Sequence, residues 1–317
     1  MTLPAPRRED NSRMDYQDTL ERIHTALKPI IGEGKVASYI PELANVAPDQ
    51  FGMAVVNIDG TVFSVGDATK RFSIQSISKL FALTLAFQRE GDSLWTRVGR
   101  EPSGTPFNSL VQLEAEHGIP RNPFINAGAL VVTDMLSTRF VNAENALVDF
   151  VRKVSGVADI TYNRRVALSE ISTSSRNAAM AHFMKSFGNM HNKVGEVLHA
   201  YCHHCAIEMN CVELARAVCF LANHGVNPWS GEVEIDASSA KRLSALMLTC
   251  GTYDAAGDFA FRVGLPAKSG VGGGIVAILP GECGICVWSP ALEVSGNSHA
   301  GSLALEMFTS LTKRSIF

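Results

Sequence analysis

The sequence predicts a mixed α/β (α+β) fold, in which an antiparallel five-stranded sheet is flanked by the terminal helices and carries a large helical insertion. Strand-like segments occur near both ends of the chain, at about 51–65 and 264–289, and short turns link them. Between about 122 and 250 the apolar residues recur instead at helical spacing. Because the strands come from both ends, the sheet can close only if the two ends of the chain meet.

The first part of the chain is predicted to hold a tail, a helix and a hairpin. Residues 1–15 are polar and are expected to form a flexible tail. Apolar residues at helical spacing over 16–31 predict an amphipathic helix. The alternating segments 51–58 and 61–65 flank Asp59-Gly60, a pair that favours a type I′ turn, so these residues predict a β-hairpin.

The middle of the chain is predicted to be helical, with short breaks rich in Asn, Gly and Ser. The predicted helices span 76–91, 127–140, 143–155, 178–187, 194–202, 210–223 and 238–250. Strands are predicted at 264–269, 274–279 and 285–289, followed by a closing helix at 300–311. We therefore expect a single domain over 16–317, with a sheet subdomain of about 16–75 and 251–317 and a helical subdomain of about 76–250.

Composition excludes several classes of protein. Of the 317 residues, 46% are hydrophobic and 19% charged, which is enough apolar material for a large core and excludes global disorder. The net charge of −3 gives no basic face for nucleic acid. No segment approaches the about 18 consecutive apolar residues of a membrane span, and residues 1–13 hold no apolar signal core. We expect a cytoplasmic protein with neither nucleic acid nor membrane as a partner.

Seven cysteines include two Cys-x-x-Cys pairs, Cys202/Cys205 and Cys283/Cys286. A zinc site would need four ligands that converge from both pairs. The first pair runs into an apolar segment, however, and residues three apart in a strand point to opposite faces. Buried thiols that act as small apolar side chains are the commoner case, so we expect structural cysteines and no metal.

Ser76 and Lys79 form a Ser-x-x-Lys motif, and this spacing of three residues brings a hydroxyl and an amine onto one face of a helix. A serine nucleophile needs a nearby base, and a lysine buried in a cleft can have its pKa lowered enough to act as one. The spacing alone is weak evidence, because Ser238/Lys241 and Ser310/Lys313 share it.

A second motif distinguishes Ser76 from the other two serines. Lys268-Ser269-Gly270 lies on a predicted strand, and a helical Ser-x-x-Lys followed by a late Lys-[Ser/Thr]-Gly strand is the pairing of penicillin-recognising serine acyltransferases. The glycines that follow allow a substrate to approach the backbone, so the N–H of Val271 could serve an oxyanion hole. A dinucleotide-binding loop is excluded, because its third glycine would fall at Ile275.

Five longer strings around these motifs span residues 34–41, 75–79, 122–128, 170–177 and 264–274. Together they resemble the serine-dependent glutaminase family, which has a β-lactamase/transpeptidase-like fold. The matching strings occur in order, and the resemblance runs from about residue 25 to 312.

The resemblance implies hydrolysis of L-glutamine to L-glutamate and ammonia, with no metal or organic cofactor, by a homo-oligomer (dimer or tetramer). The family's nucleophile matches Ser76 and its base Lys79, and Tyr253 matches a tyrosine that relays protons near the leaving amine. The implied substrate-binding residues are Tyr39, Gln75, Ser76, Asn126, Glu170, Asn177, Tyr201, Tyr253 and Val271.

These residue types suit a free amino acid as the substrate, because its ammonium and its carboxylate must both be held to orient the side-chain amide. Glu170 suits the ammonium. Neutral donors suit the carboxylate, and they would be Asn126, Asn177 and Tyr201. Backbone N–H groups of Ser76 and Val271 would hold the oxyanion.

Two other functions stay open at this point. A penicillin-recognising serine hydrolase (β-lactamase or DD-peptidase type) would share Ser76, Lys79 and Lys268. Those enzymes act outside the cytoplasm, and the sequence shows no export signal. A non-enzymatic helical interaction module would not depend on Ser76 at all.

Overall fold

The five-stranded sheet takes its strands from both ends of the chain, as predicted. The computed structural model describes residues 15–103 and 111–317, so almost all of the predicted tail 1–15 lies outside the described residues. The strand order is β2-β1-β8-β7-β6, and every neighbouring pair is antiparallel. The strands are β1 (Gly52–Asn57), β2 (Val62–Gly66), β6 (Ala267–Ser269), β7 (Gly274–Leu279) and β8 (Cys283–Trp288).

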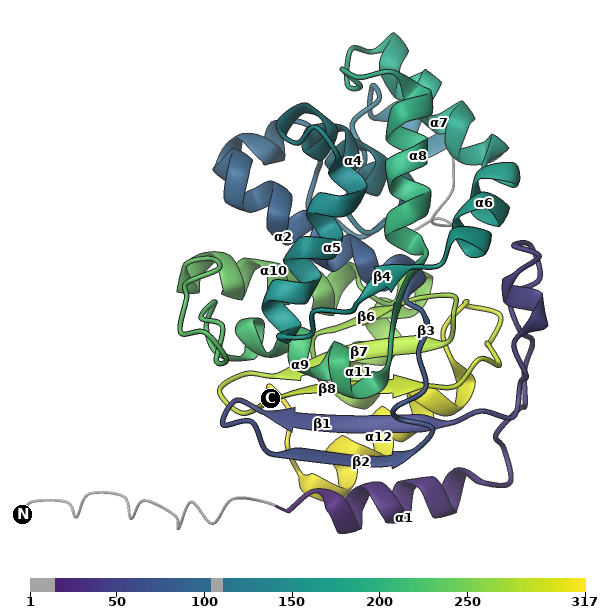
Figure 1. Ribbon diagram of the computed structural model, residues 1–317, viewed down its shortest axis with the longest axis vertical. Coiled ribbons are helices and arrows are strands. Elements are labelled where there is room, and N and C mark those ends of the chain that lie inside the picture. Colours follow the sequence, from purple (N-terminus) through teal and green to yellow (C-terminus); the bar gives the residue numbers. More distant parts are fainter. Residues whose placement is uncertain (1–14, 104–110) are drawn as a thin grey trace, which may run out of the picture.

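One face of the sheet is covered by the terminal helices, as predicted, and these two helices also lie against each other (Figure 1). Alternate strand residues such as Val55 and Ile285 pack in one apolar cluster with α1 (Gln17–Leu27) and α12 (His299–Thr312). Periodic burial of Leu20, Ile23 and Leu27 explains why α1 lies on the sheet.

The second face of the sheet is covered by α9 (Cys211–Ala222), which belongs to the predicted helical block. Part of the helical insertion therefore packs on a face of the sheet and not only beside it. Gly284 of β8 makes this approach possible, because a Cβ atom there would lie 2.1 Å from the Ala215 carbonyl oxygen of α9. An Asn210/Glu213 capping box fixes the start of α9.

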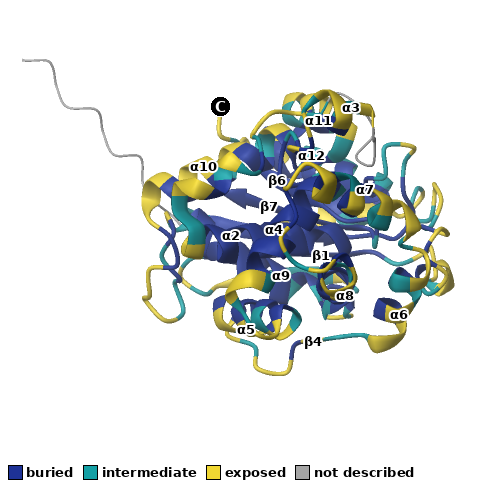
Figure 2. Ribbon diagram, turned by 90° about the horizontal axis from the view of Figure 1, so that it is seen from above, coloured by how far each residue is buried: buried dark blue, intermediate teal, exposed yellow. Residues whose placement is uncertain are grey.

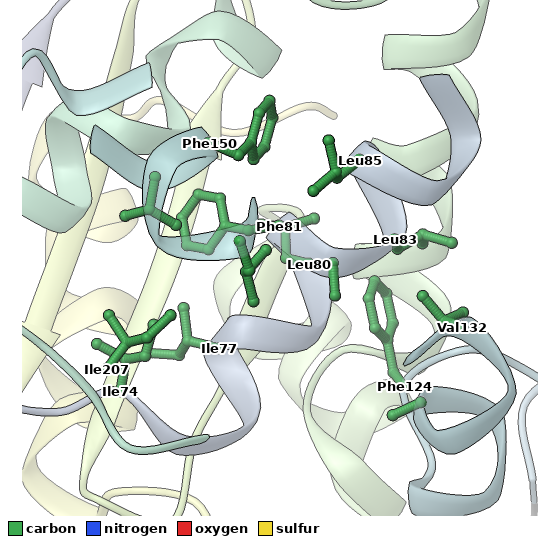
Figure 3. Packing of buried hydrophobic residues seen from close by; sticks show 14 of the residues in the cluster. Ile74, Ile77, Leu80, Phe81, Leu83, Leu85, Phe124, Val132, Phe150 and Ile207 are labelled. Atoms are coloured by element: carbon green, nitrogen blue, oxygen red, sulfur yellow. The ribbon is translucent and has the colours of Figure 1, made fainter. Parts of the chain in front are cut away.

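The predicted helices of the middle of the chain are present, with ends shifted by a few residues. They are α2 (Ser78–Glu90), α4 (Asn126–Arg139), α5 (Ala143–Ser155), α7 (Ser175–Ser186), α8 (Val194–Cys205) and α10 (Ala237–Cys250). Helix α2 is central, since its residues from Ser78 to Phe87 are all buried (Figure 2). Ile77, Leu80 and Phe81 pack toward Ile207 and Phe150 in the largest apolar cluster (Figure 3).

Several short elements were not predicted from the sequence. They are the helices α3 (Val111–Ala115), α6 (Arg164–Ser172) and α11 (Ala256–Val263), a small sheet of β3 (Phe72–Ser73), β5 (Ile207–Met209) and β4 (Thr161–Tyr162), and 3₁₀ turns at Leu43–Asn45, Gln75–Ile77, Gly91–Thr96 and Tyr253–Ala255. Two expectations were wrong in detail. The strand predicted at 264–269 begins only at Ala267, because Gly264 is left-handed and ends α11. The hairpin turn is not type I′, because only Gly60 has a positive φ, whereas Asp59 does not.

All seven cysteines are free and buried, as expected of structural thiols. Cys283 and Cys286 lie on opposite faces of the sheet, in different apolar clusters, so this pair does not converge on a common ligand. Within residues 15–103 and 111–317, no helix has the length and apolar character needed to cross a membrane.

Candidate functional site

Ser76 lies in a tight 3₁₀ turn, Gln75–Ile77, between β3 and the start of α2. The turn is strained at Gln75, whose φ is +49°, a left-handed value that non-glycine residues adopt only at some cost. Packing on both sides holds this geometry. Phe72 and Ser73 pair with β5, and Ile77 is fully buried in the core. The turn fixes the Ser76 hydroxyl at the base of α2.

Lys79 is buried one turn further on, and among the described residues no carboxylate forms an ion pair with it. Its Nζ donates hydrogen bonds to Asn126 Oδ1 at 2.6 Å and to the Phe124 carbonyl oxygen at 3.2 Å. Burial lowers the pKa of Lys79 to about 8, although the nearby Cys205 and Glu170 oppose this shift. A neutral amine, which could accept a proton from a serine, is therefore accessible near neutral pH.

Tyr253 lies beside Ser76 in the same cavity, although it is far from Ser76 in the sequence. It also has a positive φ, +56°, at the start of a 3₁₀ turn. Burial raises the pKa of its hydroxyl, while hydrogen bonds from the Ser76 side chain and the Val271 backbone oppose that effect. The phenol oxygen thus lies beside the serine oxygen, where a proton could pass between them.

Lys268 is a second buried lysine at this site, and it was not among the predicted site residues although its motif had been singled out. Its Nζ donates to the carbonyl oxygens of Gly251 (3.1 Å) and Ser269 (2.5 Å), and it lies 4.9 Å from the centre of the Tyr253 ring. Burial, followed by the charge of Lys79, lowers the pKa of Lys268 well below its usual value. The Nζ atom of Lys268 therefore lies over the face of the Tyr253 ring.

Gly270 brings the end of β6 against the serine turn. A Cβ atom at this position would lie 2.5 Å from the Ile74 carbonyl oxygen and 3.3 Å from the Ser76 nitrogen. Only glycine permits this approach of two backbone segments. As a result, Val271 follows immediately beside Ser76, which is the arrangement that two oxyanion-binding N–H groups would need.

A cavity of about 290 Å³ opens above Ser76. All the predicted site residues line it except Lys79, which reaches it through Asn126. The lining side chains come from separate elements, which include the 3₁₀ turns Gln75–Ile77 and Tyr253–Ala255, the segment before the 3₁₀ turn Leu43–Asn45, and helices α4, α6, α7 and α8. The complete lining consists of Tyr39, Ile40, Gln75, Ser76, Asn126, Glu170, Thr173, Ser174, Arg176, Asn177, Tyr201, Cys205, Tyr253 and Val271.

The three predicted neutral donors form a chain of hydrogen bonds in the cavity wall. Asn126 Nδ2 donates to Asn177 Oδ1 at 3.1 Å, and the Tyr201 hydroxyl donates to Asn126 Oδ1 at 3.4 Å. Since Asn126 Oδ1 also accepts from Lys79, the Asn126 amide is held from three directions. Asn126 therefore connects the cavity to the buried lysine.

Glu170 is the acidic side chain of the cavity. It is only 8% exposed, and within the described residues its Oε2 atom is buried without a hydrogen-bond partner. Burial raises the pKa of Glu170 to about 7, while the Gln75 side chain and Lys79 oppose the shift. A buried carboxylate with a free oxygen is suited to receive a cationic group.

Sequence reasoning missed four further polar or thiol side chains of the lining, which are Thr173, Ser174, Arg176 and Cys205. Arg176 could have been found, because it lies within the matching string 170–177 and directly precedes Asn177. Cys205 could not, because α8 was predicted to end at residue 202 and in fact continues to Cys205.

The sheet between terminal helices and α9, with a Ser-x-x-Lys turn facing a Lys-Ser-Gly strand, defines a β-lactamase-like fold. Comparison with known proteins then identifies the family: the family model described as Glutaminase matches residues 34–317. A glutaminase of Ralstonia nicotianae is 69% identical over 304 residues, covering 96% of this chain and all of that protein. One of Streptomyces coelicolor is 55% identical, covering 95% and 98%.

Solved structures agree with this result. A probable glutaminase from Bacillus subtilis, complexed with 6-diazo-5-oxo-L-norleucine, has a TM-score of 0.86 at 32% identity and covers 98% of this chain and 99% of its own. The protein Mglu in its glutamate form has a TM-score of 0.88 at 33% identity, covering 96% of this chain and 70% of its own. The chain belongs to the glutaminase family.

Replacing Gly270 with alanine tests the contact between β6 and the serine turn. We expect kcat to fall about 100-fold, since a displacement of about 1 Å in a catalytic site can cost that much. Gly195→Ala is the matched control, because a Cβ atom at Gly195 meets nothing within 4 Å. Steady-state kinetics and thermal unfolding of both variants provide the measurement. An unchanged kcat in folded Gly270→Ala protein would show that this close approach does not position the serine.

Proposed function

We propose that the protein hydrolyses L-glutamine to L-glutamate and ammonia through a glutamyl ester on Ser76. The observation that carries the proposal is the cavity itself, which joins a serine in a strained turn, a buried lysine and a buried carboxyl group with a free oxygen. Membership of the glutaminase family and the glutamate form of the related protein Mglu support the same substrate.

The proposed binding mode matches the charges of a free amino acid. The substrate ammonium pairs with Glu170, whose free oxygen gains a partner when it binds. The amides of Asn126 and Asn177 and the hydroxyl of Tyr201 turn their donors toward the carboxylate. Tyr39, Gln75 and Val271 complete the walls, so that the side-chain amide lies against Ser76.

In the first half of the reaction, neutral Lys79 takes the proton of the Ser76 hydroxyl as the oxygen attacks the amide carbon. The backbone N–H groups of Ser76 and Val271 stabilise the oxyanion, at about 3 kcal/mol for each donor in comparable sites. Tyr253 passes the proton that Lys79 received to the leaving nitrogen, so the C–N bond breaks, ammonia departs and Lys79 is neutral again. The product of this half is the ester.

In the second half, a water molecule attacks the ester carbonyl carbon, and the same lysine and tyrosine remove its proton. The C–O bond to Ser76 breaks, the serine oxygen regains its proton, and L-glutamate is released. We propose that neither half of the reaction uses a cofactor.

We further propose that residues 16–317 form one catalytic domain and that the enzyme is a cytoplasmic homo-oligomer, a dimer or a tetramer. A single apolar cluster supports the first point, since it includes both Val276 of β7 and Leu130 of α4. A core shared in this way does not separate into independently folded halves. Sedimentation of the full chain would measure the oligomeric state.

The substrate is tested by incubating the protein separately with L-glutamine and with a chromogenic β-lactam. We expect ammonia from glutamine and no turnover of the β-lactam, because Glu170 requires a cationic group in the substrate. The alternative, a penicillin-recognising hydrolase, predicts the reverse result. Opening of the β-lactam without release of ammonia from glutamine would overturn the proposed function.

The nucleophile is tested by Ser76→Ala, which should abolish nearly all kcat while the melting temperature stays close to that of the wild type. Ser310→Ala is the control, because Ser310 has the same spacing to a lysine but lies exposed on α12. We expect it to retain full activity. Substantial ammonia release by Ser76→Ala would place the nucleophile elsewhere.

The pH dependence of kcat/KM should report the free enzyme's titrating groups. Glu170 must be charged and Lys79 neutral, and both are deprotonated forms, so kcat/KM should rise with pH in two steps, near 7 and near 8.

Glu170→Gln should raise the KM for glutamine about tenfold or more. It should also remove the step near pH 7 and keep the one near pH 8. Persistence of the lower step in this variant would mean that another group titrates.

A further inference from the structure

The cavity lining contains one acidic and one basic side chain. Among the residues that line it, Glu170 is the acid and Arg176 the only lysine or arginine. Lys79 adds little to this balance, because it lies outside the lining and must be neutral to act as a base. A free amino acid carries an ammonium and a carboxylate on the same carbon atom, so its two charges require a matching pair at one end of a site.

The neutral donors of the cavity wall do not balance the carboxylate charge by themselves. The Asn126 amide donates to Asn177 Oδ1, and the Tyr201 hydroxyl donates back to Asn126 Oδ1. These groups donate in part to one another in the free protein. Moreover, none carries a positive charge, and hydrogen bonds from charged donors to a carboxylate are roughly twice as strong as neutral ones.

Arg176 is available for this role. It lies in the first turn of α7, next to Asn177, and in the described part of the chain no ion pair or hydrogen bond engages its guanidinium. By contrast, the neighbouring Arg165 of α6 donates to Glu42 at 3.1 Å and does not line the cavity. Ser174, the N-cap residue of α7, lines the cavity and makes no side-chain capping hydrogen bond, so the positive end of the helix dipole also faces the cavity.

We propose that Arg176 binds the α-carboxylate of the substrate and thereby selects free amino acids over glutamine whose carboxyl group is blocked. This inference rests on the proposed glutaminase function and assigns the charge that the site otherwise lacks. The planar guanidinium presents parallel N–H donors that match the two oxygens of a carboxylate, whereas Glu170 takes the ammonium on the same substrate carbon. A blocked carboxyl group, as in L-glutamine α-amide or peptidyl glutamine, would leave Arg176 without a partner.

The experiment compares Arg176→Gln with Arg165→Gln on two substrates, L-glutamine and its α-amide. Both arginines are exposed, so neither replacement should impair folding, and thermal unfolding verifies this. We expect Arg176→Gln to raise the KM for glutamine about 10- to 100-fold with kcat within twofold, because one charged hydrogen-bonded contact is lost. Its kcat/KM for the α-amide should stay within about twofold, so the preference of the wild type for glutamine should largely disappear. Arg165→Gln should match the wild type on both substrates.

A binding measurement keeps the inference independent of turnover. Calorimetric titration with L-glutamate should show about tenfold or greater loss of affinity in Arg176→Gln and none in Arg165→Gln. If the wild type released no ammonia from glutamine, the proposed function would fail while this titration still tested the carboxylate contact. Equal losses on glutamine and its α-amide, or an unchanged glutamate affinity, would overturn the role of Arg176.

Discussion

The antiparallel pairing of β1 with β8 is the constraint on which the rest of the structure depends. It joins residues 52–57 to residues 283–288, more than 200 positions apart in the sequence. Once this pairing exists, β7 and β6 extend the sheet and carry Lys268 to its far edge. The serine turn meets that edge because Gly270 allows the two backbones to approach. The two motifs therefore meet because of the sheet, since β6 carries one of them to the serine turn.

Desolvation links the individual groups of the site into one electrostatic system. Lys79 and Lys268 are buried with carbonyl, amide and aromatic partners in place of carboxylates, so their charged forms are disfavoured. Glu170 is buried with one oxygen unpaired, and its charged form is disfavoured as well. In the free site, burial thus disfavours the positive charges of the two lysines as well as the negative charge of Glu170. A bound ammonium would relieve part of this cost at Glu170, and the relief contributes to affinity for a zwitterion.

The sequence predicted the large elements well, because each of them carries either a long apolar run or a periodic apolar face. Strands β1, β7 and β8 are buried throughout, and α2 and α9 carry nearly continuous apolar residues. Helix α6 was missed because it buries only Val166, Ala167 and Glu170, too few to give a period. Its helical form depends on contacts with α8 and on the Asn163 cap. The two-residue strands β3 and β4 have no pattern of their own and exist through pairing with β5.

In the site too, the residues with a sequence pattern could be predicted, and those that depend on tertiary packing could not. Family-specific strings located Ser76, Asn126 and Glu170, since those residue types occur at fixed positions in them. They could not indicate that Lys268 supports the Tyr253 ring, because burial and aromatic contact depend on tertiary packing. They also gave no reason to separate Arg176 from its exposed neighbours. That distinction needs the cavity lining and the absence, within the described residues, of a partner for its guanidinium.

Backbone strain beside Ser76 shows that surrounding contacts hold the site in its geometry. Five non-glycine residues in the described part of the chain have a positive φ, and two of them, Gln75 and Tyr253, border the serine. Strain of this kind costs about 1–3 kcal/mol per residue and persists only where neighbouring contacts enforce it. At Gln75 the enforcing contacts are the β3–β5 pairing and the buried Ile77. At Tyr253 they are Lys268 and the close approach of Gly251 to the Ala267 carbonyl oxygen. Both sets belong to the joint between the sheet and the helical insertion, so the geometry of the serine depends on the packing that joins the two parts of the fold.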